Sequence, residues 1–139
     1  MKKEEKAIVQ NPNDISRIAS DMYVVRGEIN LVHDIRIDGH CDGNITSKAR
    51  IIIGETANVK GKVICNNLDV WGNIDGEIIV RDCLSLKKGC SVTGIVRTAN
   101  IVSEYGARLN GDTKIIEGDT FTELCKGNRF LEVQEEGNN

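Results

Sequence analysis

The side chains best suited to metal binding or nucleophilic catalysis are the two histidines and five cysteines of this 139-residue chain. With only His33 and His40, one chain cannot supply the three histidines of a common catalytic zinc site. A site shared between subunits, or one with mixed cysteine and histidine ligands, stays open. His40 precedes Cys41 directly, but adjacent residues of a strand point to opposite faces. The sequence therefore predicts no catalytic, cofactor-binding or metal site, and we expect both histidines on solvated turns.

The cysteines do not form the pattern of a disulfide framework. They are odd in number and include no Cys-x-x-Cys pair. This spacing favours reduced, buried thiols in a cytosolic protein. The sequence also contains no Gly-x-x-x-x-Gly-Lys-Ser/Thr phosphate loop and no Gly-x-Ser-x-Gly nucleophile elbow. The five residues are Cys41, Cys65, Cys83, Cys90 and Cys125.

Composition indicates an ordinary soluble surface. Charged residues make up 28% of the chain and the net charge is −3, so we predict no nucleic-acid partner. No apolar run approaches the roughly 20 residues that span a bilayer, and the first residues lack the apolar centre of a secretory signal. We expect a single domain in the cytoplasm, with the inner face of the cell membrane as the alternative location.

The elements that position these side chains follow from a repeat. A figure of apolar, polar, glycine, polar, apolar residues, such as Ile74 to Ile78, recurs six times with its last copy weaker. The central glycines are 16, 18, 15, 18 and 17 residues apart. Repeats of this length are typical of stacked architectures. These structural glycines are Gly27, Gly43, Gly61, Gly76, Gly94 and Gly111.

A second marker keeps the same period. Apolar residues one position apart occur at Ile35/Ile37, Ile51/Ile53, Leu68/Val70 and Leu84/Leu86. We extend this series back to Ile18 and forward to Ile101 and Ile115. Ile18 itself also fits a short amphipathic helix formed with Ile15, Ala19 and Met22, but the period favours a first strand.

Alternation within each figure is the two-residue period of a strand. The sequence therefore predicts an all-β, single-domain parallel β-helix of about six coils, each of 16–17 residues with two or three strands of three to five residues. Glycine would lie at inward corners, where larger side chains collide with neighbouring coils. We place the β-helix at residues 16–122, between flexible tails at 1–15 and 123–139. Both phenylalanines, which follow the last clear coil, are expected to cover or extend its end.

A family resemblance is carried by four copies of the glycine figure and by two segments between them. The copies are Arg26-Gly27-Glu28-Ile29, Asp42-Gly43-Asn44-Ile45, Lys60-Gly61-Lys62-Val63 and Asp75-Gly76-Glu77-Ile78, and the segments are Ile35–Gly39 and Leu68–Gly72. This repeat resembles that of the bactofilins, bacterial polymer-forming cytoskeletal proteins. The resemblance implies a right-handed winding and end-to-end assembly into non-polar filaments without nucleotide or other cofactor. It also implies scaffolding of cell-shape, cell-wall, cell-division or chromosome-organising proteins.

Two further implications concern the termini. Several family members attach to the inner membrane through a short apolar N-terminal segment, whereas the first ten residues here include five charged side chains. A C-terminal phenylalanine contributes to the end contact of the family, and Phe121 matches it best, followed by Phe130. Repeat proteins normally cover their first and last repeats with polar capping units, so the apolar residues of the first and last coils are also expected at the end contact. The predicted polymer interface comprises Ile18, Met22, Val24, Leu109, Ile115, Phe121, Leu124 and Phe130.

Two other functions remain open at this level, because a β-helix alone does not fix an activity. One is a binding module that does not polymerise. The other is a trimeric enzyme like the hexapeptide-repeat acyltransferases, which keep a stricter six-residue period. Nucleotide-independent fibres would favour the filament, a single small species the binding module, and a coenzyme A dependence the enzyme.

Overall fold

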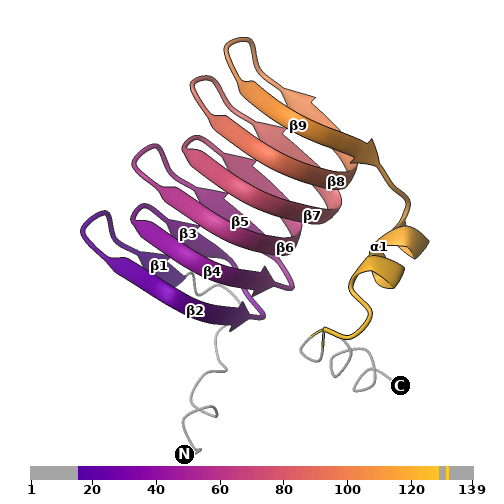
Figure 1. Cartoon of the computed structure of the whole chain (residues 1–139), viewed down its shortest axis with the longest axis horizontal. Coiled ribbons are helices and arrows are strands. Elements are labelled where there is room, and N and C mark those ends of the chain that lie inside the picture. Colours follow the sequence, from indigo (N-terminus) through magenta and orange to yellow (C-terminus); the bar gives the residue numbers. More distant parts are fainter. Residues whose placement is uncertain (1–15, 129–130, 132–139) are drawn as a thin grey trace, which may run out of the picture.

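The computed structural model describes residues 16–128 and 131, and these residues wind into a parallel β-solenoid of about six turns (Figure 1). Each strand from β1 to β8 pairs in parallel with its equivalent one turn later, which confirms the predicted β-helix. The predicted N-terminal tail, 1–15, lies outside the described residues. The strands are β1 (Ser16–Ile18), β2 (Tyr23–Leu31), β3 (Ile35–Ile37), β4 (His40–Ser47), β5 (Arg50–Ile53), β6 (Asn58–Val70), β7 (Asn73–Leu86), β8 (Ser91–Ser103) and β9 (Arg108–Ile115).

We call each turn a coil and number the coils 1 to 6 from the N-terminus. Every coil has a short face and a long face. The short face runs through β1, β3, β5 and the C-terminal parts of β6, β7 and β8. The long face runs through β2, β4, the N-terminal parts of β6 to β8, and β9.

Strands in the middle coils are longer than the three to five residues predicted. β6 and β8 have 13 residues and β7 has 14, because their ladders continue around a corner. A glycine bends each of these strands within the long face, and a break in register, as between Cys65 and Asn67, turns the chain onto the short face. At this corner the strand of one coil therefore stays paired with the strand of the next on both sides of the break.

Inward-facing side chains stack in columns along the rod axis. On the short face, Ile51, Leu68 and Leu84 form one such column and are fully buried. Ile18 heads the neighbouring column by pairing with Ile37, so its assignment to a first strand is confirmed and the helical alternative is wrong. Stacked aliphatic columns explain why the repeat must occur many times, since one coil alone cannot bury its own apolar residues.

The central glycines of the figure form a column of their own on the long face. From Gly43 to Gly111 they have positive φ angles, and a Cβ added to any of them would overlap the carbonyl oxygen of the glycine before it. Their predicted role at inward corners agrees with this packing. Coil 1 departs from the rule: Arg26 takes the positive φ angle, at 53°, and the pairing of β2 with β4 shifts between Val25 and Gly27.

The column that runs from Ile35 to Ile101 begins with Ser16, so Ile18 lies outside it, contrary to the expected series. Ile115 does not continue this column either. It pairs with Thr98 at the end of β9, in an inward column of the long face that also holds Cys65 and Val80. Its 59% exposure arises because the described chain has no further coil to cover this column. The shortened spacing of 14 residues before Ile115 therefore marks a change of face.

One short helix follows the last coil. The helix α1 (Gly118–Leu124) turns back from β9 and lies against the side of the stack (Figure 1). The boundary predicted between residues 122 and 123 cuts this helix, and Cys125 just after it is buried. The described chain after β9 is therefore packed along the rod and does not extend its tip.

Candidate assembly surfaces

The N-terminal end of the rod presents the open edges of β1 and β2, each of which pairs with one strand among the described residues. Val24, Ile29 and Leu31 head inward columns here and are half-buried, because only one coil covers them. Met22, Tyr23 and Val25 are exposed around the same edge. Of the predicted interface residues, the structure thus places Val24 and Met22 at this end. Ile18 lies there too but is buried.

The C-terminal end presents the open edge of β9 and of the last part of β8. Leu109 and Ile115, both predicted for the interface, terminate inward columns of the long face here. Two other inward columns end in polar residues, since Thr113 follows Val96 and Ser103 follows Leu86. This end is therefore less apolar than the N-terminal one, although Ile115 and the outward-facing Val102 add exposed aliphatic surface.

Phe121 lies on the side of the rod, so the expectation that it covers the tip of the last coil is wrong for the described chain. Phe121 is 6% exposed and packs with Ile64 and Ile79 from coils 3 and 4. The Arg81 guanidinium carbon lies 5.1 Å from the ring centroid. Leu124, the other predicted interface residue on α1, packs against the same cluster. Phe130 lies outside the described residues.

We call this group the flank cluster. Its buried members share a location outside the rod, beneath or beside α1, and are separate from the interior columns: Ile64, Ile79, Ile116, Phe121 and Cys125. The sequence carries a signal for this cluster. In Val63-Ile64-Cys65 and Ile78-Ile79-Val80 the alternation fails, because the outward position is apolar on two successive coils. Residues 121, 124 and 125 also have the spacing of one helix face.

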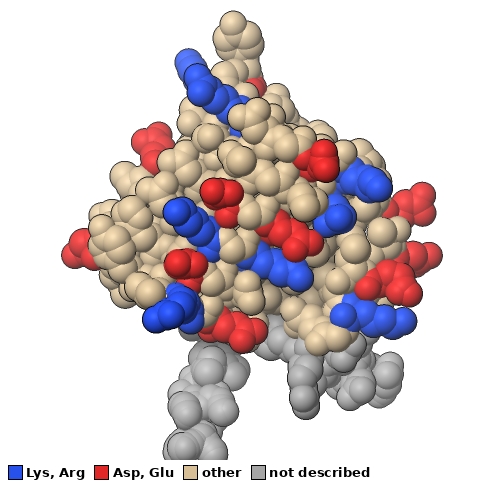
Figure 2. Space-filling model, in the orientation of Figure 1, with Lys and Arg blue, Asp and Glu red and all other residues tan. Residues whose placement is uncertain are grey.

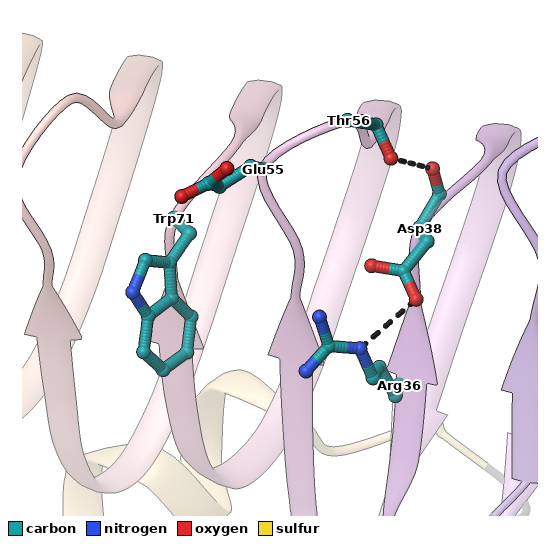
Figure 3. A pocket seen from close by; sticks show the side chains of 5 residues that line it. All are labelled: Arg36, Asp38, Glu55, Thr56 and Trp71. Carbon is teal, nitrogen blue, oxygen red and sulfur yellow. Dashed lines mark hydrogen bonds and ion pairs between the residues drawn. The ribbon is translucent and has the colours of Figure 1, made fainter.

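A polar groove with a volume of about 390 Å³ lies on the short-face side of the rod (Figure 3). Arg36 and Trp71 come from different coils and stand on two sides of it, with Glu55 and Thr56 from the coil between. Trp71 packs outward, and the Lys87 amine of the next coil lies 5.3 Å from its ring centroid. These residues form interactions between coils and do not combine a nucleophile with a base.

Asp38 connects the first three coils through hydrogen bonds beside this groove. Its carboxylate accepts hydrogen bonds from Arg36 Nε at 2.9 Å and Arg17 Nε at 3.0 Å, while its carbonyl accepts one from Thr56 Oγ1 at 2.6 Å. The hydrogen bond from Arg36, followed by that from Arg17, lowers the pKa of Asp38 against the opposing effect of burial. The same hydrogen bond raises the pKa of Arg36. The buried carboxylate is thereby held in its charged form.

The histidines and cysteines singled out by the sequence are dispersed. His40 points outward and stacks on Tyr23 with ring centroids 4.4 Å apart, whereas Cys41 is buried inside the rod. Their predicted opposite orientation is confirmed. Burial raises the pKa of the Cys41 thiol, which disfavours the thiolate needed for nucleophilic chemistry. Within residues 16–128 and 131, no three histidine, cysteine or acidic side chains come together as a metal site.

Surface charge gives the rod no single sign on the side that Figure 2 displays, where basic and acidic residues are interspersed. Several form ion pairs between coils, such as Arg50 with Asp69 and Arg97 with Glu77. Within the described part of the chain, no helix is long and apolar enough to cross a membrane. The features able to mediate assembly are therefore the two open ends and the flank.

Comparison with known protein families gives this architecture a name. The family model described as "Bactofilin: Polymer-forming cytoskeletal" matches residues 16–114, from the first residue of β1 almost to the end of β9. The chain belongs to the bactofilin family. The match covers nearly the whole solenoid, including Ile64 and Ile79 of the flank cluster, and stops before α1, which therefore lies outside the part that defines this bactofilin as a member.

A curated relative supports the assignment. The chain is 28% identical over 95 residues to the protein named Bactofilin BacO from Myxococcus xanthus (strain DK1622), a stretch that covers 68% of this bactofilin and 75% of the relative. No solved structure matches the chain. The chain therefore belongs to a family of polymer-forming cytoskeletal proteins, and the resemblance of its repeat to that of the bactofilins is confirmed.

Proposed function

We propose that this bactofilin assembles end to end into filaments through its first and last coils, without a bound nucleotide. The observation that carries the proposal is the run of inward columns through the rod, which no further coil covers at either tip among residues 16–128 and 131. Val24 begins a column that continues through Cys41, Val59, Ile74 and Val92 to Leu109. A second rod stacked on either tip would extend these columns and pair strand edges that are otherwise open.

We further propose that like ends meet, so that the filament has no polarity. The chemistry of the two tips supports this arrangement, since they differ. The N-terminal tip has mostly aliphatic column ends, with Ser16 as the exception, and a shifted register at Arg26. The C-terminal tip has a regular edge with Thr113 and Ser103 among its column ends. In a two-fold contact each tip would meet a surface with the same column ends and the same register.

The proposed biological role is structural. Such filaments would scaffold proteins of cell shape, the cell wall or cell division in the cytoplasm, including at the inner face of the membrane, and would perform no catalysis. The absence of polarity would let partners bind along the filament without a preferred direction. The partners of this bactofilin would recognise the sides of the rod, because its ends would be buried in junctions.

The test blocks the C-terminal tip and determines which oligomers still form. Leu109→Arg/Ile115→Arg places two cations in the C-terminal junction, where burying unpaired charge is strongly unfavourable. Tyr105→Arg, on an exposed turn of the same coil, is the matched control. We expect parent and control to form fibres in electron micrographs with and without nucleotide. The blocked variant should stop at dimers joined through their N-terminal tips.

Each other outcome has a definite meaning. Monomers in the blocked variant would show that opposite ends meet and would overturn the non-polar arrangement. Fibres as long as those of the parent would show that the C-terminal tip is not a junction. A parent that remains a single small species at high concentration would overturn end-to-end assembly and favour the binding module.

A further inference from the structure

The outside of the solenoid carries one column whose chemistry changes along the rod. From coil 2 to coil 6 its residues are Thr46, Ile64, Ile79, Arg97 and Lys114. The two isoleucines pack against Phe121 of α1, and Thr46 on coil 2 is buried beside Ile64. The polar residues Arg97 and Lys114 follow on coils 5 and 6, beyond the contact with Phe121. A solvated column would be polar throughout, so the apolar pair is built for a contact.

The helix that makes this contact is short and has few attachments. α1 has seven residues, and no side chain caps its N-terminus at Glu117. Helices of this length are marginal in isolation, so the helical state of α1 depends on docking. Phe121 and Cys125 supply its buried surface, whereas Thr122 and Glu123 are exposed. Few buried contacts are typical of segments that open locally while the rest of a fold stays intact.

The rim of the flank cluster carries both charges. Glu77 Oε2 accepts a hydrogen bond from Arg97 at 3.1 Å, and its other oxygen lies 4.0 Å from the Lys62 amine. A two-fold copy of this face could therefore set Lys62 of one rod against Glu77 of the other while the isoleucines meet. Sheets pack face to face at about 10 Å, and a self-complementary face is what a two-fold contact requires.

We infer that the flank beneath α1 is a lateral interaction surface for a second copy of this bactofilin, and that α1 is a reversible strap that keeps it covered. With the strap docked, rods join only at their tips. With the strap open, successive subunits of a filament present a row of apolar flanks, and neighbouring filaments pair side by side. The inference shares with the proposed function only its partner, another copy of the chain, since the surfaces differ.

The experiment measures strap opening and lateral pairing separately, in full-length protein carrying Cys83→Ser. The remaining interior thiols are buried in the rod, so maleimide labelling of Cys125, located by peptide mass spectrometry, reports opening. Phe121→Arg should open the strap, because Arg81 repels the new cation. We expect labelling at least about tenfold faster, equivalent to ~1.4 kcal/mol of lost docking. Electron micrographs should then show ribbons of paired filaments in place of single ones.

A second variant separates opening from pairing. Phe121→Arg/Ile64→Thr/Ile79→Arg opens the strap and also makes the flank beneath it polar. Its new residues at positions 64 and 79 are of the same types as Thr46 and Arg97 on the adjoining coils. It should label as fast as Phe121→Arg but form single filaments. Phe121→Ala, read by the same assays, covers the case in which the arginine impairs folding, which circular dichroism would reveal.

Several results would overturn the inference. They are slow Cys125 labelling in both Phe121 variants, fast labelling without ribbons, and ribbons of equal width from the variant with the polar flank. If no variant forms filaments, the end-to-end proposal fails on its own. Lateral pairing is then measured by analytical ultracentrifugation. Phe121→Arg should form a dimer, and Phe121→Arg/Ile64→Thr/Ile79→Arg should remain a monomer. A monomer in both would refute the inference as well.

Discussion

Gly76 of coil 4 lies directly on Gly61 of coil 3, so close that a Cβ on Gly76 would overlap the carbonyl oxygen of Gly61. The obstacle is backbone, which cannot rotate away as a side chain could. Gly76 also has a φ angle of 151°, which residues with a side chain rarely adopt. At the spacing that the paired strands impose, this corner of the long face therefore has room only for glycine.

The first prediction follows from this contact. Gly76→Ala should lower the free energy of unfolding by roughly 3–5 kcal/mol, the sum of backbone strain and forced overpacking. Gly89→Ala, with a φ angle of 88° and open space for the methyl group, should cost only about 1–2 kcal/mol. Gly118→Ala should be nearly neutral. Urea unfolding of the three variants measures the series, and equal losses would contradict the stacking argument.

The second prediction concerns strain in coil 1. Arg26 has a φ angle of 53°, a conformation that costs a residue with a Cβ about 1–2 kcal/mol. Arg26→Gly removes this strain but gives the unfolded chain more freedom, so we expect a net gain of about 0.5–1 kcal/mol in unfolding free energy. Arg26→Ala keeps the strain and should show no gain. A higher melting temperature for the alanine variant than for glycine would refute this account.

The third prediction is a pH dependence that arises from Asp38. Its pKa is lower in the folded protein than in the unfolded chain, so its stabilising effect is complete above the unfolded value of about 3.9 and is lost as pH falls through the folded value. Asp38→Asn should lower the unfolding free energy at pH 7 by about 1–3 kcal/mol. The difference from the parent should shrink in acid below about pH 4.

The exposed carboxylate of Asp112 provides the control for this measurement. Asp112→Asn should change the unfolding free energy at pH 7 by less than about 0.5 kcal/mol, as expected of surface positions. Thermal or urea unfolding at several pH values between neutral and acid measures both variants. A pH-independent loss in Asp38→Asn would mean that the side chain acts through packing and not through its charge.

The fourth prediction concerns the thiols. Burial raises the pKa of Cys65, Cys90 and Cys125, the last to about 11, and four of the five side chains are buried. Ellman's reagent at pH 8 should therefore react quickly with one thiol per folded chain, the half-buried Cys83, and with all five after denaturation. Cys83→Ser should remove the fast phase. Two or more fast thiols in the parent would show that the rod or the strap opens readily.

The sequence by itself determined the solenoid. Its two markers, the central glycines and the apolar pairs one residue apart, repeat in phase because each coil must place the same kind of residue in the same column. Ile18 could be assigned to a first strand for this reason, although its neighbours also fit a helix. In a stack of equivalent coils the length of one coil equals the period of the sequence repeat, so the architecture can be predicted from the sequence alone.

The tertiary structure alone decided where α1 lies and which column Ile115 occupies. Periodicity describes contacts between equivalent positions of successive coils, and it is silent about a segment that leaves the repeat and folds back on it. Phe121 therefore looked like part of the tip and proved to lie on Ile64 and Ile79, far from it in sequence. The signal was present as two apolar residues at outward positions, but only the folded chain shows that its own helix covers them.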